Sequence, residues 1–440
     1  MSDSQTVSVV AVWLLVCGVG AAAVMALPSS KIQKLGWFGT AWRLFALAVG
    51  VRLIAALVFR LPESAIINFD KDSLEIVGQL VRDRVDVYSQ PDRYPYFPLF
   101  AYWFGATSWF SSVTGIPFEP LPKLAGIAAD AGIAVLLLRW WGNASTRGLR
   151  LGLFYALNPL TIIVAAVHGQ IDSGAVFFLL AAAYTVRNDV TPRSGIVAGA
   201  LLGLAVVSKT WPIAFLPLFV LRLPSWRARI EVTVLTLGVV GLALLAYSAI
   251  FWVAPQRAIE VIRDYEGVRG RWGVFVALHH LGNAGIPGAI RIHDLAVDWN
   301  RYLLVAALGV GVAAAWRAEI ARGIAVALLT TMVVFYGWGY HWVMWPVPFL
   351  LIGFPLRVSA AYYWVATATL VAEFFFNGGI TSWAFDLFAV DSPMIRYRWV
   401  LPLPLWGVVC AIVAGFLFVR LRSALRPRGG PVTEVEQVPV

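Results

Sequence analysis

Two carboxylates, Asp70 and Asp72, lie two residues apart just after an apolar stretch that ends near Arg60. The segment that follows predicts an amphipathic helix over 73–85 on a membrane surface, because its apolar residues recur at helical spacing: Leu74, Val77, Leu80, Val81 and Val85. Carboxylates at such a boundary can take a proton from a lipid-borne substrate. They could instead cap the helix. Asp70 and Asp72 could also bind a divalent cation, but two carboxylates are few oxygen ligands for one, so we predict no metal and no cofactor.

A second polar group interrupts hydrocarbon-like sequence at residues 168–173, which read His-Gly-Gln-Ile-Asp-Ser. Polar and ionisable side chains at this depth are costly, and they predict a functional site formed by His168, Gln170 and Asp172. The competing interpretation is a polar turn in which Asp172 or Ser173 caps the next helix.

Two basic candidates stand at breaks between apolar segments. Lys209 follows one half-length segment and precedes another, and an ammonium there needs an anion such as Asp172 or a phosphate. Snorkelling of Lys209 to the interface is the alternative. His341 begins a later apolar segment among aromatic residues, where it could donate to a phosphate or a carboxylate, or cap a helix in the aromatic belt.

The loop 254–300 carries a net positive charge that includes Arg269 and Arg271. Binding of an anionic lipid headgroup would explain this charge. The neighbouring pair His279 and His280 lacks a third ligand at a credible spacing, so the loop predicts no metal site.

The elements that must position these residues are membrane helices. The 440 residues are 60% hydrophobic and 13% charged, and the mean hydropathy is +0.77. Apolar stretches long enough to cross a hydrocarbon core of about 30 Å recur along the whole chain. We predict an all-α polytopic bundle of about thirteen spans, near 8–27, 41–60, 121–141, 151–167, 174–187, 194–208, 211–222, 230–253, 301–316, 323–338, 342–356, 359–377 and 399–421.

Charge predicts the orientation of this bundle. Arginine and lysine cluster in short loops that we place in the cytoplasm: Lys31/Lys34/Arg43, Arg139/Arg147/Arg150, Arg187/Arg193, Arg222/Arg227/Arg229, Arg317/Arg322 and Arg420 to Arg428. The number of spans between two cytoplasmic clusters must be even, which excludes residues 96–113 as a span. We place these residues along the outer surface or in a re-entrant segment. Residues 61–120 become a large outer loop with interfacial amphipathic helices, and 254–300 a second outer loop. Residues 1–425 form one membrane-embedded domain, followed by a disordered cytoplasmic tail over 426–440.

The chain is predicted to be an integral protein of a microbial plasma membrane, as the scarcity of lysine, five of 34 basic residues, hints at a GC-rich genome. Membrane lipids are its surroundings, and no nucleic-acid partner is predicted, because the positive charge follows the spans. A P-loop, a dinucleotide-binding glycine fingerprint, HExxH and GxSxG are all absent from the sequence.

The ordered set of motifs resembles the GT-C superfamily of membrane glycosyltransferases. Asp70 or Asp72, the amphipathic segment and the run YPYFPLFAYW, which contains Tyr94, are similar to the first outer loop of GPI mannosyltransferase I and related bacterial mannosyltransferases. Where those enzymes carry Asp-x-Asp, Asn68 and Asp70 stand here. NPLTIIVAAVHGQIDS, LAVVSKTWPIAFLPLF and GYHWVMWPVPFLL are similar to motifs of the dolichyl-phosphate-glucose glucosyltransferases, although Trp342 and Val343 replace the Glu-Lys that follows the histidine there.

The resemblance implies transfer of a sugar, with inversion, from a polyprenyl-phosphate donor to a hydroxyl of a lipid-linked or glycan acceptor on the non-cytoplasmic face. Mannose is the expected sugar. Asp70 or Asp72 would be the catalytic base, and the substrate-binding residues would be His168, Gln170, Asp172, Lys209, Arg269, Arg271, His341 and Tyr94.

A transporter or flippase of a lipid or sugar is the alternative from a different functional class, because intramembrane charges also mark transport paths. No inverted internal repeat is found, and the carboxylates of the first outer loop lie away from the expected midplane. The sequence therefore favours the transferase.

Overall fold

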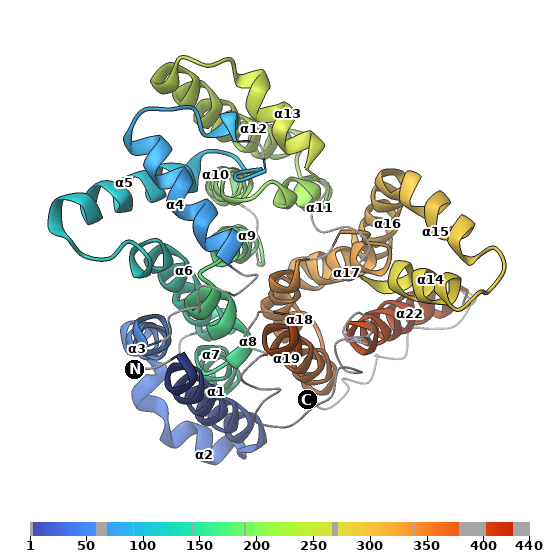
Figure 1. Cartoon of the computed structure of the whole chain (residues 1–440). Helices are drawn as coiled ribbons and strands as arrows, with labels where there is room; N and C mark the ends of the chain where they lie inside the picture. The colour runs from blue at the N-terminus through green and yellow to red at the C-terminus, as the bar shows by residue number, and fades with distance from the viewer. Residues whose placement is uncertain are drawn as a thin grey trace.

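The computed structural model describes residues 3–58, 68–90, 92–142, 145–188, 191–265, 272–337, 339–377 and 402–425. Within these ranges the chain is helical, and most of its helices run side by side as a bundle (Figure 1). Five described helices are long and apolar enough to cross a membrane, and two bent helix pairs would raise this number to seven. An all-helical membrane fold is therefore confirmed, whereas the count of thirteen spans stays a prediction.

The amino-terminal half of the bundle is built around α3 and α6. Its members pack through small and branched residues such as Leu44, Ala48, Ile127 and Ala134, which are all buried. The elements of this half are α1 (Asp3–Ala26), α2 (Ser29–Lys34), α3 (Ala41–Val58), α6 (Pro120–Arg139), α7 (Thr146–Ala156), α8 (Pro159–Ile162), the π-helical η3 (Ile163–His168) and α9 (Asp172–Thr185).

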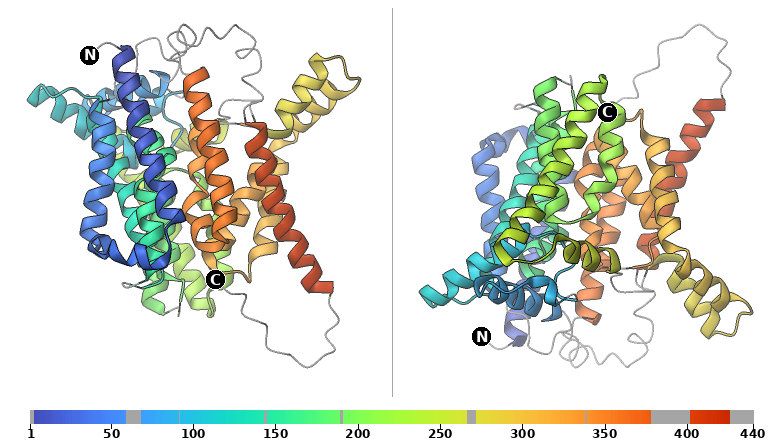
Figure 2. Two further views of the ribbon diagram at one scale, coloured as in Figure 1. Left: turned by 90° about the horizontal axis from the view of Figure 1, so that it is seen from below. Right: turned by 90° about the horizontal axis from the view of Figure 1, so that it is seen from above.

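Two helices of the first loop, α4 (Asn68–Arg82) and α5 (Leu99–Thr114), lie across one end of this bundle (Figure 2). Glycines let them approach closely, since a Cβ on Gly78 would lie 2.8 Å from the Phe104 carbonyl oxygen. The expected start of the amphipathic helix at residue 73 is wrong. The helix begins at Asn68, so Asp70 and Asp72 lie inside it and the capping interpretation is wrong as well.

A hydrogen-bonded latch ties the first loop to α12 (Trp226–Phe251). The Tyr247 hydroxyl donates to Asp86 Oδ1 at 2.8 Å and accepts from the Val87 N–H at 2.8 Å. Arg257 of α13 (Pro255–Asp264) forms an ion pair with Asp86 at 3.2 Å. The latch fixes the position of the loop that follows α4.

The middle helices pack through a stripe of glycines on α10 (Pro192–Ser208). A Cβ on Gly199 would lie 3.0 Å from the Val232 Cα atom, and the Thr236 hydroxyl donates to the Gly199 carbonyl at 3.1 Å. Small residues thus allow α10 and α12 to pack closely. Between them in sequence lie η4 (Trp211–Phe215) and α11 (Leu216–Arg222).

The carboxyl-terminal half completes the bundle and adds a projecting arm. The arm consists of α14 (Gly273–Asn283) and α15 (Ala289–Asp298), at the same end as α4 (Figure 2). The remaining elements are α16 (Asn300–Ala315), α17 (Ile320–Val333), η5 (Tyr340–Met344), α18 (Val347–Gly353), α19 (Leu356–Asn377) and α22 (Leu403–Leu425). The predicted tail over 426–440 lies outside the described residues.

Candidate active site

The broken segment that connects α7 to α9 carries His168 and Gln170 toward α4. Helix α7 ends at Ala156, and a new helix begins when the Asn158 side chain accepts from the Thr161 N–H and Pro159 takes the first helical position. The two pieces meet at 46°, and the second ends as a π-helix at His168. Gly169 has a φ of +80°, which glycine adopts at low cost, and it turns the chain toward α9.

A buried arginine holds this break together. The Arg52 guanidinium donates to the Ala156 carbonyl at 2.9 Å and to Thr161 Oγ1 at 2.9 Å, and its Nε donates to Asp130 Oδ2 at 2.6 Å. Asp130 also accepts from the Tyr155 hydroxyl at 2.7 Å. The helix-end groups exposed by the break are thereby satisfied inside the bundle.

Arg52 and Asp130 were not predicted as site residues, although the sequence contained an indication of their importance. Both residues lie inside predicted apolar spans, where ionisable side chains are rare and paired. Because both side chains are 0% exposed and saturated with protein partners, we assign them to positioning and not to contact with a substrate.

Asp70 meets the polar break directly. Its Oδ2 lies 2.9 Å from His168 Nε2 and 2.9 Å from Gln170 Nε2. The Asp70 side chain keeps 38% of its surface exposed, whereas that of His168 keeps 1%. Among the described residues both contacts fall on Oδ2, so Oδ1 is the oxygen that can accept a proton. Asp72 is exposed on the same helix.

The electrostatics of this corner keep Asp70 ionised. Burial raises the pKa of Asp70, but the hydrogen bond and positive charge of His168, with smaller contributions from His341 and Lys209, outweigh it and hold the pKa below its ordinary value. A low pKa means that the carboxylate is present at neutral pH, ready to accept a hydrogen bond.

Lys209 and Asp172 form a second, fully buried pair. Lys209 Nζ donates to Asp172 Oδ2 at 2.7 Å, and Trp345 Nε1 donates to Asp172 Oδ1 at 2.6 Å. Asp172 is thus the anion that Lys209 requires, and snorkelling of Lys209 is wrong because the residue is only 2% exposed. Capping by Asp172 is also wrong, since α9 has Ile171 at its N-cap with no side-chain cap.

His341 lies between the two acidic positions. Its Nε2 atom lies 3.7 Å from Asp172 Oδ2, and its ring centroid lies 5.8 Å from that of His168. The structure therefore brings together six of the sequence-predicted residues: Asp70, His168, Gln170, Asp172, Lys209 and His341.

Two of the predicted residues that the structure describes, Asp72 and Tyr94, are not part of this cluster. Tyr94 is buried in the first loop, where its hydroxyl donates to the Phe97 carbonyl at 2.9 Å and accepts from the Ala101 N–H at 3.0 Å, so it stabilises the loop and does not face a substrate. Arg269 and Arg271 lie outside the described residues.

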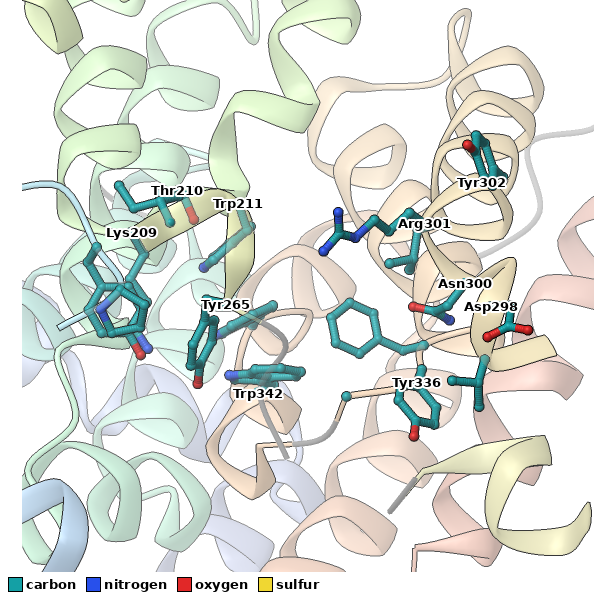
Figure 3. A pocket seen from close by; sticks show the side chains of 18 residues that line it. Lys209, Thr210, Trp211, Tyr265, Asp298, Asn300, Arg301, Tyr302, Tyr336 and Trp342 are labelled. Atoms are coloured by element: carbon teal, nitrogen blue, oxygen red, sulfur yellow. The ribbon is translucent and has the colours of Figure 1, made fainter. Parts of the chain in front are cut away.

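A cavity of about 650 Å³ opens beside this cluster (Figure 3). Lys209, Trp211 and Tyr265 stand on one side of it, and Asp298, Asn300 and Arg301 stand across from them. Tyr96, another lining residue, has its ring 4.6 Å from Lys209 Nζ. Burial and then the charges of Asp172 and Asp70 raise the pKa of Tyr96, which shows how near the acids lie to the cavity.

Aromatic rings form much of the cavity wall. Trp345 is stacked between Trp211, at 4.4 Å between centroids, and Trp342, at 5.3 Å. Flat apolar faces beside a few convergent polar groups are typical of small-molecule sites. Sequence reasoning missed these rings and Arg301, because aromatic residues are frequent throughout the chain and no spacing distinguishes those at the cavity.

Within the described ranges no group of three His, Cys, Asp or Glu side chains is arranged as a metal ion would require. Searches of curated proteins and of solved structures found no match to the chain. A search of protein families matched residues 94–339 to glycosyltransferase family 87. This match covers more than half of the 440 residues and includes the polar break, Lys209 and most of the residues that line the cavity, whereas Asp70 and His341 lie outside the matched range. The chain therefore belongs to glycosyltransferase family 87, a family of GT-C-type membrane glycosyltransferases.

Proposed function

We propose that the protein transfers a sugar, mannose in the first instance, from a polyprenyl-phosphate donor to a hydroxyl of a lipid-linked or glycan acceptor on the non-cytoplasmic face, with inversion. The observation that carries this proposal is the position of Asp70. It is an ionised, partly exposed carboxylate held by His168 and Gln170, in the same cluster as Lys209, which lines the cavity at one end of the membrane bundle. Family membership supports the transferase over the transporter alternative.

Asp70 is proposed as the base because, of the two candidates Asp70 and Asp72, only Asp70 contacts the polar break. The attacking acceptor hydroxyl gives its proton to Asp70 while its oxygen forms a bond to the anomeric carbon. The bond from that carbon to the phosphate oxygen breaks, and the polyprenyl phosphate leaves with the electron pair. Attack opposite the leaving group inverts the anomeric configuration. The two donors to Oδ2 orient the carboxylate during this step.

The departing phosphate requires positive charge. Lys209 was the expected partner, and the structure pairs it with Asp172, which offsets part of its charge. Arg301 supplies a second cation on the opposite wall of the same cavity, and its side chain extends toward Trp211 in Figure 3. We propose that Lys209 and Arg301 stabilise the phosphate by their charge, because preorganised charge acts most strongly in a water-poor site. His341 contributes as a hydrogen-bond donor to the same group.

The decisive experiment compares Asp70→Asn with Asp72→Asn, which removes the same charge two residues away on the same helix. Purified protein is given labelled polyprenyl-phosphate mannose and a membrane lipid extract. We expect Asp70→Asn to lower transfer by about 100-fold or more, the range for loss of a general base, with donor binding kept. Asp72→Asn should remain near wild type.

Two results would contradict the proposal. Activity retained in Asp70→Asn and lost in Asp72→Asn would move the base two residues along α4. Absence of transfer by the wild type from mannose and glucose donors alike would remove the proposed donor class.

A further inference from the structure

Two further cavities lie at the end of the bundle opposite Asp70. The larger, of about 1250 Å³, lies between α22, the start of α19 and the loop before α17. Its neighbour, of about 850 Å³, extends toward α7. The two adjoin, since they share Arg322, Phe354, Pro355 and Arg357 among their lining residues, and together they are called the groove. In Figure 2, α22 diverges from α19 toward this end of the bundle.

The walls of the groove are apolar and have room for hydrocarbon. Helix α22 contributes Ala411, Gly415, Phe416 and Val419 to them. A Cβ placed on Gly415 would meet no atom within 4 Å, so no part of the described protein fills the space over this residue. A hollow of this size against apolar side chains can accept acyl chains.

The rim of the groove is strongly basic. Six arginines line the two cavities, with Glu319 as the acid among them: Arg147, Arg150, Arg317, Arg322, Arg357 and Arg420. Arg420 lies 5.4 Å from the Phe416 ring centroid, and Arg322 lies 5.7 Å from that of Phe354. Burial raises the pKa of Glu319, against the opposing effect of Arg322 and Arg222. Arginine is suited to phosphate because its planar donors can bind two oxygens at once.

We propose that this groove binds an anionic phospholipid from the leaflet opposite the active site. The phosphate lies among Arg322, Arg357 and Arg420, and the acyl chains lie along α22 over Gly415. Positive charge alone is ordinary at the cytoplasmic ends of spans. Here the charge surrounds an apolar hollow, which matches a molecule with an anionic head and hydrocarbon tails. The inference is independent of the proposed sugar transfer.

The test distinguishes the contribution of the apolar space over α22 from that of the arginine charges at the rim. Gly415→Leu fills the hollow and keeps every arginine, and its matched control is Gly407→Leu on the same helix outside the lining, where a Cβ also meets nothing within 4 Å. The double variant Arg357→Gln/Arg420→Gln removes charge, and Arg193→Gln removes an exposed charge at the same end outside the groove. Native mass spectrometry of the purified full chain measures bound phosphatidylglycerol against phosphatidylcholine.

We expect the wild type to retain phosphatidylglycerol in preference to phosphatidylcholine. Gly415→Leu and the double arginine variant should each lower this retention by about tenfold, and neither control should. Equal losses in variants and controls would show general surface attraction and overturn the proposal. So would unchanged retention in Gly415→Leu, or displacement of the lipid by inorganic phosphate alone.

A melting experiment tests the other candidate occupant, the chain's own carboxyl terminus. With lipid as the occupant, phosphatidylglycerol raises the melting temperature of the wild type and of a chain ending at Arg428 equally. A shortened chain that is less stable and shows no response to lipid would assign the groove to residues 429–440 and overturn the proposal.

Discussion

Asp70 and Asp172 are two carboxylates in one cluster whose surroundings give them different tasks. Asp172 is 0% exposed and has one oxygen bonded to Lys209 and the other to Trp345. Its charge is fully committed, and removal of one member of such a buried pair leaves an uncompensated charge that costs about 3–5 kcal/mol. Asp70 is partly exposed and has partners on one oxygen only among the described residues. This difference fits a structural role for Asp172 and the proposed role of Asp70 as the base.

The pH dependence of activity should report the contact between Asp70 and His168. A carboxylate whose pKa is depressed keeps its charged form above that pKa and loses it as the pH falls through it. The acid limb that belongs to Asp70 should therefore lie below the ordinary aspartate value of 3.8. In His168→Asn the hydrogen bond that lowers the pKa of Asp70 is removed, while burial continues to raise that pKa. The acid limb of kcat/KM should then move to higher pH.

The measurement is a pH profile of sugar transfer for wild type and His168→Asn. Asp83→Asn is the control, since Asp83 is exposed and bonded to Arg82 at the far end of α4. An acid limb that stays in place in His168→Asn would show that His168 does not control the ionisation of Asp70.

At the residue scale the sequence predicted the members of the cluster and one of its pairs. His168, Asp172, Lys209 and His341 could be found because ionisable side chains next to hydrocarbon are costly and therefore informative. Asp172 was one of two anions expected for Lys209, and the structure shows that pair. The bond from Trp345 to Asp172 could not be predicted, because it joins residues 173 positions apart and depends on how the helices pack. Tyr94 was chosen from its motif, and the tertiary structure uses its neighbour Tyr96 at the cavity instead.

At the scale of elements, the turn at Gly169 connects the π-helix to α9 and holds His168 and Gln170 in place. A Cβ on Gly169 would lie 2.9 Å from Lys123 Cγ, and φ there is +80°. Lys123 is itself buried and donates to the Val167 carbonyl at 3.2 Å, so it has little room to move.

We expect Gly169→Ala to be less stable than Gly142→Ala and to lose activity. Both positions have positive φ, which costs an L-residue about 1–2 kcal/mol, but a Cβ on Gly142 meets nothing within 4 Å. The difference between the two variants isolates the collision with Lys123. Thermal unfolding in detergent and sugar transfer are the measurements. Equal stability and activity of the two would show that the turn tolerates displacement of Lys123.

Helix positions could be predicted from apolar length and loop charge, and the helices α1, α3 and α6 agree closely with the expected spans 8–27, 41–60 and 121–141. The start of α4 could not be predicted, because its first turn is mostly polar and the amphipathic spacing of apolar residues begins only at residue 73. The π-helix at Ile163–His168 could not be predicted either, since Arg52 from a distant helix satisfies the groups at the break before it.

At the scale of the whole molecule, the bundle has two chemically different ends. One end carries α4 and α5 (Figure 2), with Asp70 on α4. The other end carries the arginine-rimmed groove. The charge distribution predicts that the first end faces away from the cytoplasm.

Cysteine labelling in intact cells tests this orientation. In a chain with Cys17→Ala and Cys410→Ala, a membrane-impermeant maleimide should label Asp72→Cys directly. Arg193→Cys should be labelled only after permeabilisation. Both positions are exposed, so access to the reagent depends on the side of the membrane. The reverse pattern would invert the proposed topology and place the reaction in the cytoplasm.

The Arg52 network also constrains how the protein is made. A helix that carries an unpaired arginine at its centre is disfavoured in a bilayer by about 2.5–3.5 kcal/mol. The partners of Arg52 arrive late, since Asp130 follows it by 78 residues and the Ala156 carbonyl by 104. Helix α3 must therefore be sheltered during synthesis, by the insertion machinery or near the lipid headgroups, until α6 and α7 have emerged. Formation of the candidate site therefore depends on α3, a helix synthesised much earlier, reaching its final position in the bundle.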